Sequence, residues 1–203
     1  GAFGACPELS SVTLNEGLTT IEANVFSACE KLTEIHLPES LTSIGGYAFE
    51  KCTGLTAIEF PKAVKTIDYS AFAACSGLTS VQLPPYIETV PQGMFRGCTN
   101  LERVVIPNTV TAIGEGAFES CLKLMKVYYG DKLEKWNEIN ITAKGNADLL
   151  YATIICLDKT IPAKKCTDEI LQSGTCGDNL TWEMNGYGVL HISGTGYMKS
   201  YQA

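Results

Sequence analysis

Apolar side chains recur along the first two thirds of the chain with a fixed spacing of 23 residues. A phenylalanine marks each period, and a cysteine follows it by three residues. The phenylalanines are Phe3, Phe26, Phe49, Phe72, Phe95 and Phe118, and the cysteines are Cys6, Cys29, Cys52, Cys75, Cys98 and Cys121. No insertion interrupts these units. A fixed period of this length predicts a repeat architecture.

The unit reads F-x-x-C-x-x-L-x-x-I-x-L-P-x-x-V-x-x-I, followed by a turn rich in glycine or alanine. Its I-x-L segment alternates as a strand with one buried face does. Proline then ends the strand because it lacks an N–H group, at Pro38, Pro61, Pro84 and Pro107. A unit this short cannot bury its apolar positions alone, so neighbouring units must stack. The sequence predicts a mostly β leucine-rich-repeat solenoid of 23-residue coils, with one long parallel sheet on one face.

A second short apolar segment, such as residues 41–44, is expected to supply the opposite wall of each coil. A hydroxyl column at Thr20, Ser43, Thr66 and Thr89 precedes its last apolar residue and is placed to form a ladder between coils. Glycines before the next phenylalanine are expected to allow tight turns, some with positive φ. These glycines are Gly45, Gly46, Gly93, Gly114 and Gly116.

The pattern C-x-x-L-x-x-I-x-L-P-x-x-V-x-x-I-x-x-x-A-F resembles the BspA-like leucine-rich repeats of bacterial surface proteins, because both the cysteine and the proline recur in phase. The resemblance covers residues 1–129 as six units. It implies a secreted or wall-attached protein, extracellular or on the cell surface, that takes part in adhesion to host proteins or to other cells.

Beyond residue 129 the period fails. Gly130 replaces the proline, and Trp136 is expected at the position of Ile113. We expect residues 130–155 to cap the array, residues 156–175 to form a linker and residues 176–203 to begin a second β-rich module. That module is expected to contain a hairpin around the turn at residues 185–188. The sequence starts inside a repeat and ends soon after a new strand-like segment, which suggests that it is a piece of a longer protein.

Composition and charge exclude two classes of partner. The net charge is −7 and Lys and Arg do not cluster, so the basic surface that phosphate backbones require is missing and we expect no nucleic acid. No run reaches the ~20 apolar residues that span a bilayer, so we expect no membrane span in this segment.

The nine cysteines raise the question of metal or redox chemistry. Six of them share one repeat position, where stacked side chains point the same way, so we interpret them as a column of structural thiols. Zinc needs four converging ligands, and a single column of cysteines cannot readily supply them. The chain has only two histidines, His36 and His191. We therefore expect no metal and no cofactor. A disulfide between two of Cys156, Cys166 and Cys176 stays open.

The sequence contains no recognisable set of catalytic residues. No Ser, Cys or Thr lies in a nucleophile motif, and His36 occupies a strand position that is held elsewhere by unrelated residues. Glu34 and Glu59 are the only outward carboxylates expected near one another. We therefore predict that the chain is not an enzyme.

The outward face of the strands is the candidate binding face. Its character changes along the array from hydroxyl through acidic to basic, and Arg and Tyr are enriched in binding hot spots. The candidate residues are Glu34, His36, Glu59, Gln82, Arg103, Val105, Lys126 and Tyr128. The leading hypothesis is protein–protein binding or adhesion to a host or other cell-surface macromolecule through this face. The alternative is a structural spacer or stalk without a ligand of its own; the oligomeric state stays open.

Overall fold

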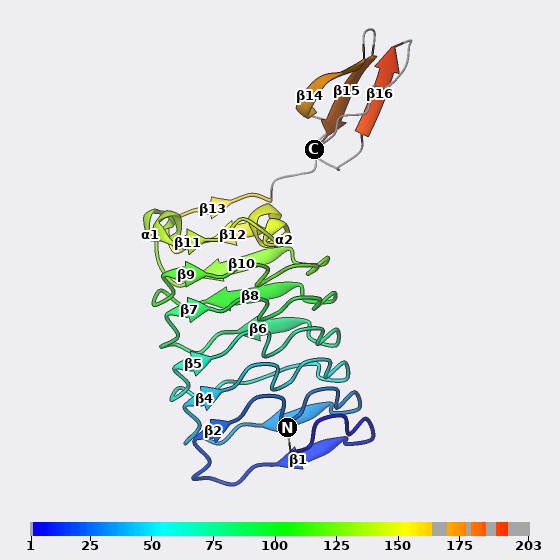
Figure 1. Cartoon of the computed structure of the whole chain (residues 1–203). Coiled ribbons are helices and arrows are strands. Elements are labelled where there is room, and N and C mark those ends of the chain that lie inside the picture. The colour runs from blue at the N-terminus through cyan, green and yellow to red at the C-terminus, as the bar shows by residue number, and fades with distance from the viewer. Residues whose placement is uncertain (1, 164–169, 178–179, 186–189, 195–203) are drawn as a thin grey trace. The chain divides into compact units, whose positions relative to one another are not determined.

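The computed structural model describes residues 2–163, 170–177, 180–185 and 190–194. It divides into two compact units, residues 1–163 and residues 164–203. The first unit is a stack of similar coils, seen from the side in Figure 1. We number the coils 1 to 6 by their phenylalanines, from Phe3 to Phe118. The predicted solenoid is confirmed.

Two walls of short parallel strands run along the stack (Figure 1). The strand wall contains β1 (Ser11–Thr13), β3 (Glu34–His36), β6 (Ser80–Gln82), β8 (Arg103–Ile106), β10 (Lys126–Tyr129) and β12 (Thr153–Ile155), and β13 (Thr160–Ile161) closes it in antiparallel fashion. The second wall contains β2 (Thr20–Ile21), β4 (Ser43–Ile44), β5 (Thr66–Ile67), β7 (Thr89–Val90), β9 (Ala112–Ile113) and β11 (Asn140–Ile141). Equivalent repeat positions are paired, as Val104 is with Val127.

The expected single sheet is interrupted, which corrects the prediction. Residues 57–59 of coil 3 form no strand, so β1 and β3 are separated from the sheet that starts at β6. The second wall breaks between β5 and β7. Gly114 donates its N–H to Val90 O, but Pro91 at the equivalent position has no N–H to offer Ile67 O. In coil 3 the bulkier Phe60 also stands where most other coils have an aliphatic residue.

A column of stacked phenylalanine rings forms the centre of the core. Consecutive ring centroids from Phe3 to Phe118 lie between 5.1 and 6.0 Å apart, with interplanar angles up to 27°. From Phe26 onward the rings are at most 1% exposed. Phe60 meets Phe72 edge-on at 5.5 Å. The stacking requires neighbouring coils, so each coil depends on the next for its burial.

The cysteine column is a ladder of thiols that donate to backbone carbonyls. From Cys29 to Cys121, each Sγ lies 3.0 to 3.2 Å from the carbonyl oxygen of the phenylalanine in the preceding coil, as Cys75 Sγ does with Phe49 O. The cysteines from Cys29 to Cys121 are fully buried, and all six are free. Cys156 is also free, and Cys166 and the side chain of Cys176 lie outside the described part of the chain.

The glycines before each phenylalanine serve two different purposes. Gly93 and Gly116 have positive φ, as expected, but the same conformation is held by Tyr47 and Ser70 in other coils. Gly45 and Gly114 do not have positive φ, and instead allow close approach between coils. A Cβ on Gly45 would lie 2.6 Å from Ala23 N. The hydroxyl column is joined at one step, where Thr66 Oγ1 lies 2.9 Å from Ser43 Oγ.

The last coil is closed by α1 (Leu133–Glu138) and α2 (Ala147–Tyr151). Trp136 is buried in α1, and Ile141 pairs with Ile113, so the expectation that Trp136 takes the place of Ile113 was wrong. The compact unit continues to residue 163, eight residues beyond the expected cap.

The side chain of Asn146 in the closing segment takes the place of a backbone carbonyl of a further coil. In coils 1 to 5 the phenylalanine N–H donates to a carbonyl of the next coil, as Phe95 N does to Ala117 O. For Phe118 the acceptor is Asn146 Oδ1, at 3.0 Å. Asn146 Nδ2 in turn donates to Gly114 O and Thr142 O. Asn146 is fully buried, and it terminates the ladder without leaving these groups unpaired.

The second unit contains β14 (Ile170–Gly177), β15 (Leu180–Asn185) and β16 (Leu190–Gly194). β15 pairs with both neighbours in antiparallel fashion, which confirms the expected hairpin between β15 and β16. β14 begins within the range that was expected to be linker. None of the helices in the described residues is long and apolar enough to cross a membrane.

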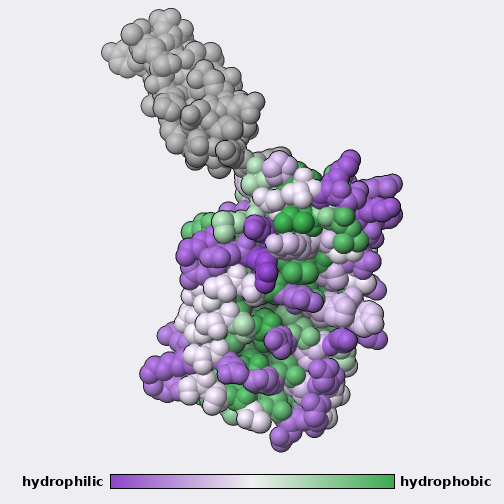
Figure 2. Space-filling model, turned by 180° about the vertical axis from the view of Figure 1, so that it is seen from behind, coloured by the Kyte–Doolittle hydropathy of each residue, from purple (hydrophilic) through white to green (hydrophobic). Residues whose placement is uncertain are grey.

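The surface of the array is mixed rather than uniformly polar. Figure 2 shows, on the side opposite to that of Figure 1, apolar residues exposed along the middle of the stack between margins of hydrophilic residues. Among the large exposed hydrophobic residues are Tyr86, Leu122 and Met125. Exposed apolar side chains are normal in soluble proteins and do not by themselves mark a site.

Candidate functional site: the strand face

Strand pairing arranges the outward side chains of the strand wall, which we call the strand face, in two columns. The first column contains Ser11, Glu34, Ser80, Arg103, Lys126 and Thr153, and the second contains Thr13, His36, Gln82, Val105, Tyr128 and Ile155. Ala57 and Glu59 hold the equivalent positions in coil 3. All eight residues predicted from the sequence therefore belong to this face, and six of them are exposed while Val105 and Tyr128 are half-buried.

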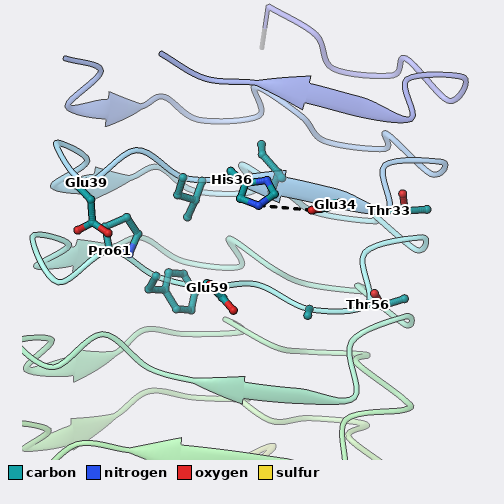
Figure 3. A pocket seen from close by; sticks show the side chains of 11 residues that line it. Thr33, Glu34, His36, Glu39, Thr56, Glu59 and Pro61 are labelled. Carbon is teal, nitrogen blue, oxygen red and sulfur yellow. Dashed lines mark ion pairs between the residues drawn. The ribbon is translucent and has the colours of Figure 1, made fainter. Parts of the chain in front are cut away.

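The face is acidic over coils 2 and 3. Glu34, Glu39 and Glu59 line an open cavity of about 570 Å³ together with His36 (Figure 3). His36 Nε2 lies 3.4 Å from Glu34 Oε1, and both side chains are largely exposed. The two carboxylates expected to be neighbours thus line one cavity. We call Glu34, His36 and Glu59 of the strand face the acidic half.

The backbone beside this cavity is open. Within residues 2–163, the segment 56–60 forms no backbone hydrogen bond, whereas the equivalent strands β6, β8 and β10 are paired. A second hollow of about 370 Å³ lies on its other side, lined by Phe60, Lys62 and Pro84 among others. Coil 3 is therefore the least tightly bonded part of the strand wall.

Coils 5 and 6 carry the opposite charge. Arg103 and Lys126 are direct neighbours across β8 and β10, and the guanidinium of Arg103 lies 6.0 Å from the centroid of the Tyr128 ring. They line a shallow cavity of about 330 Å³ with Met125 and Glu102. We call Arg103, Lys126 and Tyr128 the basic half. Its cations are unpaired with any acidic side chain within the described residues.

Ile155 extends the second column beside Tyr128 and was missed by sequence reasoning. The repeat of 23 residues points to position 151, but the closing segment is longer than a coil and delivers Thr153–Ile155 instead. The β-branched run Thr153-Ile154-Ile155 was the available signal for a strand. Val105, Tyr128 and Ile155 together give the basic half an apolar margin.

The thiols are unsuited to nucleophilic chemistry at neutral pH. Desolvation by burial raises the pKa of Cys52 and of Cys98 to about 12, and burial also raises the pKa of Cys75 well above its ordinary value. A buried thiol with such a pKa stays protonated and donates its hydrogen bond. Among the described residues, no group of three or more His, Cys, Asp or Glu side chains is arranged to hold a metal ion.

The family model of the BspA type leucine rich repeat region matches residues 1–139 with six copies. The chain belongs to the BspA-type leucine-rich repeat family. No curated protein sequence matched it.

Solved structures show where this BspA-type array resembles known folds. A leucine-rich repeat protein of T. pallidum is 34% identical, with a TM-score of 0.60 over 65% of this chain and 65% of that one. A leucine-rich repeat protein from Bacteroides ovatus is 23% identical, with a TM-score of 0.55 over 77% of this chain and 52% of that one. The pneumococcal vaccine antigen PcpA is 18% identical, with a TM-score of 0.58 over 75% and 42%. The BspA-type chain thus spans less than two thirds of each neighbour's length.

Proposed function

We propose that this BspA-type chain is part of a secreted or surface-attached protein, and that its array binds another protein through the strand face. Residues 130–155 close the array in this proposal, and residues 176–203 belong to a further β-rich module. The proposed location is supported by membership of the BspA-type family, because the repeats resemble those of bacterial surface proteins.

The basic half is the observation that carries the binding proposal. Two unpaired cations lie beside the partly exposed ring of Tyr128 and the apolar side chains of Val105 and Ile155. An apolar margin next to desolvatable Arg and Tyr side chains is the composition of a protein-binding hot spot. The residue types on the face also differ from coil to coil, although the core repeats. A surface that served only as a spacer has no need of this charge segregation.

Reversal of the two charges of the basic half should weaken binding that passes through it. We expect peptides selected from a random phage-displayed library on the immobilised wild-type chain to bind Arg103→Glu/Lys126→Glu at least about tenfold more weakly, because hot-spot residues each carry ~2 kcal/mol or more. Biolayer interferometry with the synthesised peptides measures the change.

Lys65→Glu/Lys123→Glu is the matched control. Both lysines are exposed, neither lies on the strand face, and the change in net charge is the same. Binding to this variant should equal that of the wild type within about twofold. If selected peptides bind all three proteins equally, or if no peptide is selected, the spacer function replaces the one proposed here.

A further inference from the structure

We propose that the partner of the strand face is a second copy of this chain, packed face to face with its coils in the reverse order. This inference rests on the proposed function of the strand face and names its partner. The twofold axis would run parallel to the strands, through Ser80 and Gln82 of coil 4. Coil 2 then lies opposite coil 6 of the second copy, and coil 3 lies opposite coil 5.

Charge complementarity selects this arrangement. Rotation about coil 4 places Glu34 directly opposite Lys126 of the second copy. It also places Glu59 within one arginine side chain's reach of Arg103, two residues along the opposing strand. The twofold axis repeats both pairs. The other possible axis, parallel to the stack, would set each coil against the same coil of the second copy, so that acidic half faces acidic half and basic half faces basic half, and like charges in apposition are disfavoured.

The residues at the axis suit contact with themselves. Ser80 and Gln82 each carry a donor and an acceptor, so two identical side chains can satisfy one another across the axis. His36 lies opposite Tyr128, which offers an aromatic surface. At the rim Glu39 lies opposite Asp131, where solvent and salt screen the repulsion. The centre and both halves of the face are therefore self-complementary.

The size of the face predicts a weak complex. With strands spaced by ~4.8 Å and three residues of ~3.3 Å exposed on each, the face is roughly 30 Å long and 10 Å wide. Such an area is well below the ~800 Å² per partner of stable complexes. Association should therefore depend on the ion pairs, and it should weaken steeply as salt is added.

Sedimentation equilibrium of the full chain tests this inference, with reductant present because Cys6 is exposed and free. At 20 mM salt and protein concentrations up to 1 mM, the wild type should approach the mass of a dimer, and at 500 mM salt it should remain a monomer. Glu34→Lys/Glu59→Lys should be a monomer under both conditions. Arg103→Glu/Lys126→Glu should be a monomer as well. The Lys65→Glu/Lys123→Glu control should behave as the wild type.

A mixture of the two reversed variants gives the decisive result. One variant presents only basic halves and the other only acidic halves, so an equimolar mixture should form a heterodimer although neither variant associates alone. A monomeric wild type at 20 mM salt would overturn the inference. A wild-type dimer that survives both reversals, or a mixture that stays monomeric, would overturn it as well. The peptide-binding experiment can succeed in each of these cases, so the two proposals fail separately.

Discussion

Raising the pH from 9 to 12 is expected to unfold the array. Burial raises the pKa of Cys52 and Cys98 to about 12 from an ordinary value of 9.0. Because the folded pKa is raised, this stability is fully present below pH 9 and is lost as the pH rises toward 12. A pKa that is raised by about three corresponds to roughly 4 kcal/mol of stability for each thiol. Two such thiols together are comparable to the ~5–15 kcal/mol that stabilises a typical domain.

Urea denaturation followed by circular dichroism at pH 7, 9, 10 and 11, with reductant, measures this loss. Lysines and tyrosines also titrate in this range, so the control is Cys52→Ser/Cys98→Ser, whose hydroxyls can still donate to Phe26 O and Phe72 O but do not ionise. The variant should lose markedly less stability between pH 9 and 11 than the wild type. Parallel losses in the two proteins would show that the thiols do not govern alkaline unfolding.

Replacing Asn146 with alanine is expected to cost about 3 kcal/mol, which corresponds to a fall in Tm on the order of 10 °C. The amide of Asn146 joins Phe118 N, Gly114 O and Thr142 O at 2.6 to 3.0 Å. Alanine would leave Phe118 N and Thr142 O without this partner at the buried end of the stack, whereas Gly114 O would keep its 3.3 Å bond from Ala117 N. Each unsatisfied group costs ~1–3 kcal/mol.

Asn137→Ala is the matched control, because Asn137 is exposed on α1 and forms no side-chain hydrogen bond within residues 2–163. Differential scanning calorimetry of both variants separates the loss of the closing contacts from a general effect of removing an asparagine. Asn146→Asp should also destabilise the array, since a carboxylate retains the acceptor for Phe118 N but turns an oxygen toward two carbonyls. Equal Tm values for Asn146→Ala and Asn137→Ala would contradict this account of the closing segment.

Within the array, the sequence predicted the structural features that repeat every 23 residues, and it did not predict those that occur only once. Strict spacing predicted the stacked phenylalanines, the buried thiols and the membership of the strand face, because each depends only on equivalent positions lying side by side. The break in each wall, at β5–β7 and at residues 57–59, depends on local chemistry instead. Pro91 lacks one amide and Phe60 adds bulk, and neither breaks the apolar pattern by which strands are recognised.

The closing segment was predicted least well, for a related reason. Its residues follow no period, so Ile155 and Asn146 had no equivalents from which a role could be read. Asn146 acts through three backbone groups that are distant in sequence, and this relation is visible only in three dimensions. Tyr47 and Ser70 adopt positive φ because the stacked neighbours hold them there, which overrides their intrinsic preference.

The breaks in the two walls fall on adjacent coils, and this has a mechanical consequence. Between coils 3 and 4 both walls lack strand pairing, while backbone bonds near the aromatic column, such as Phe49 N to Ala71 O at 2.8 Å, still join the two sides. A force that pulls along the stack is therefore carried by few backbone hydrogen bonds between coils 3 and 4 and by more of them between other coils. The array is therefore weakest between coils 3 and 4, and under tension it would part there into two blocks that each keep their own paired strands.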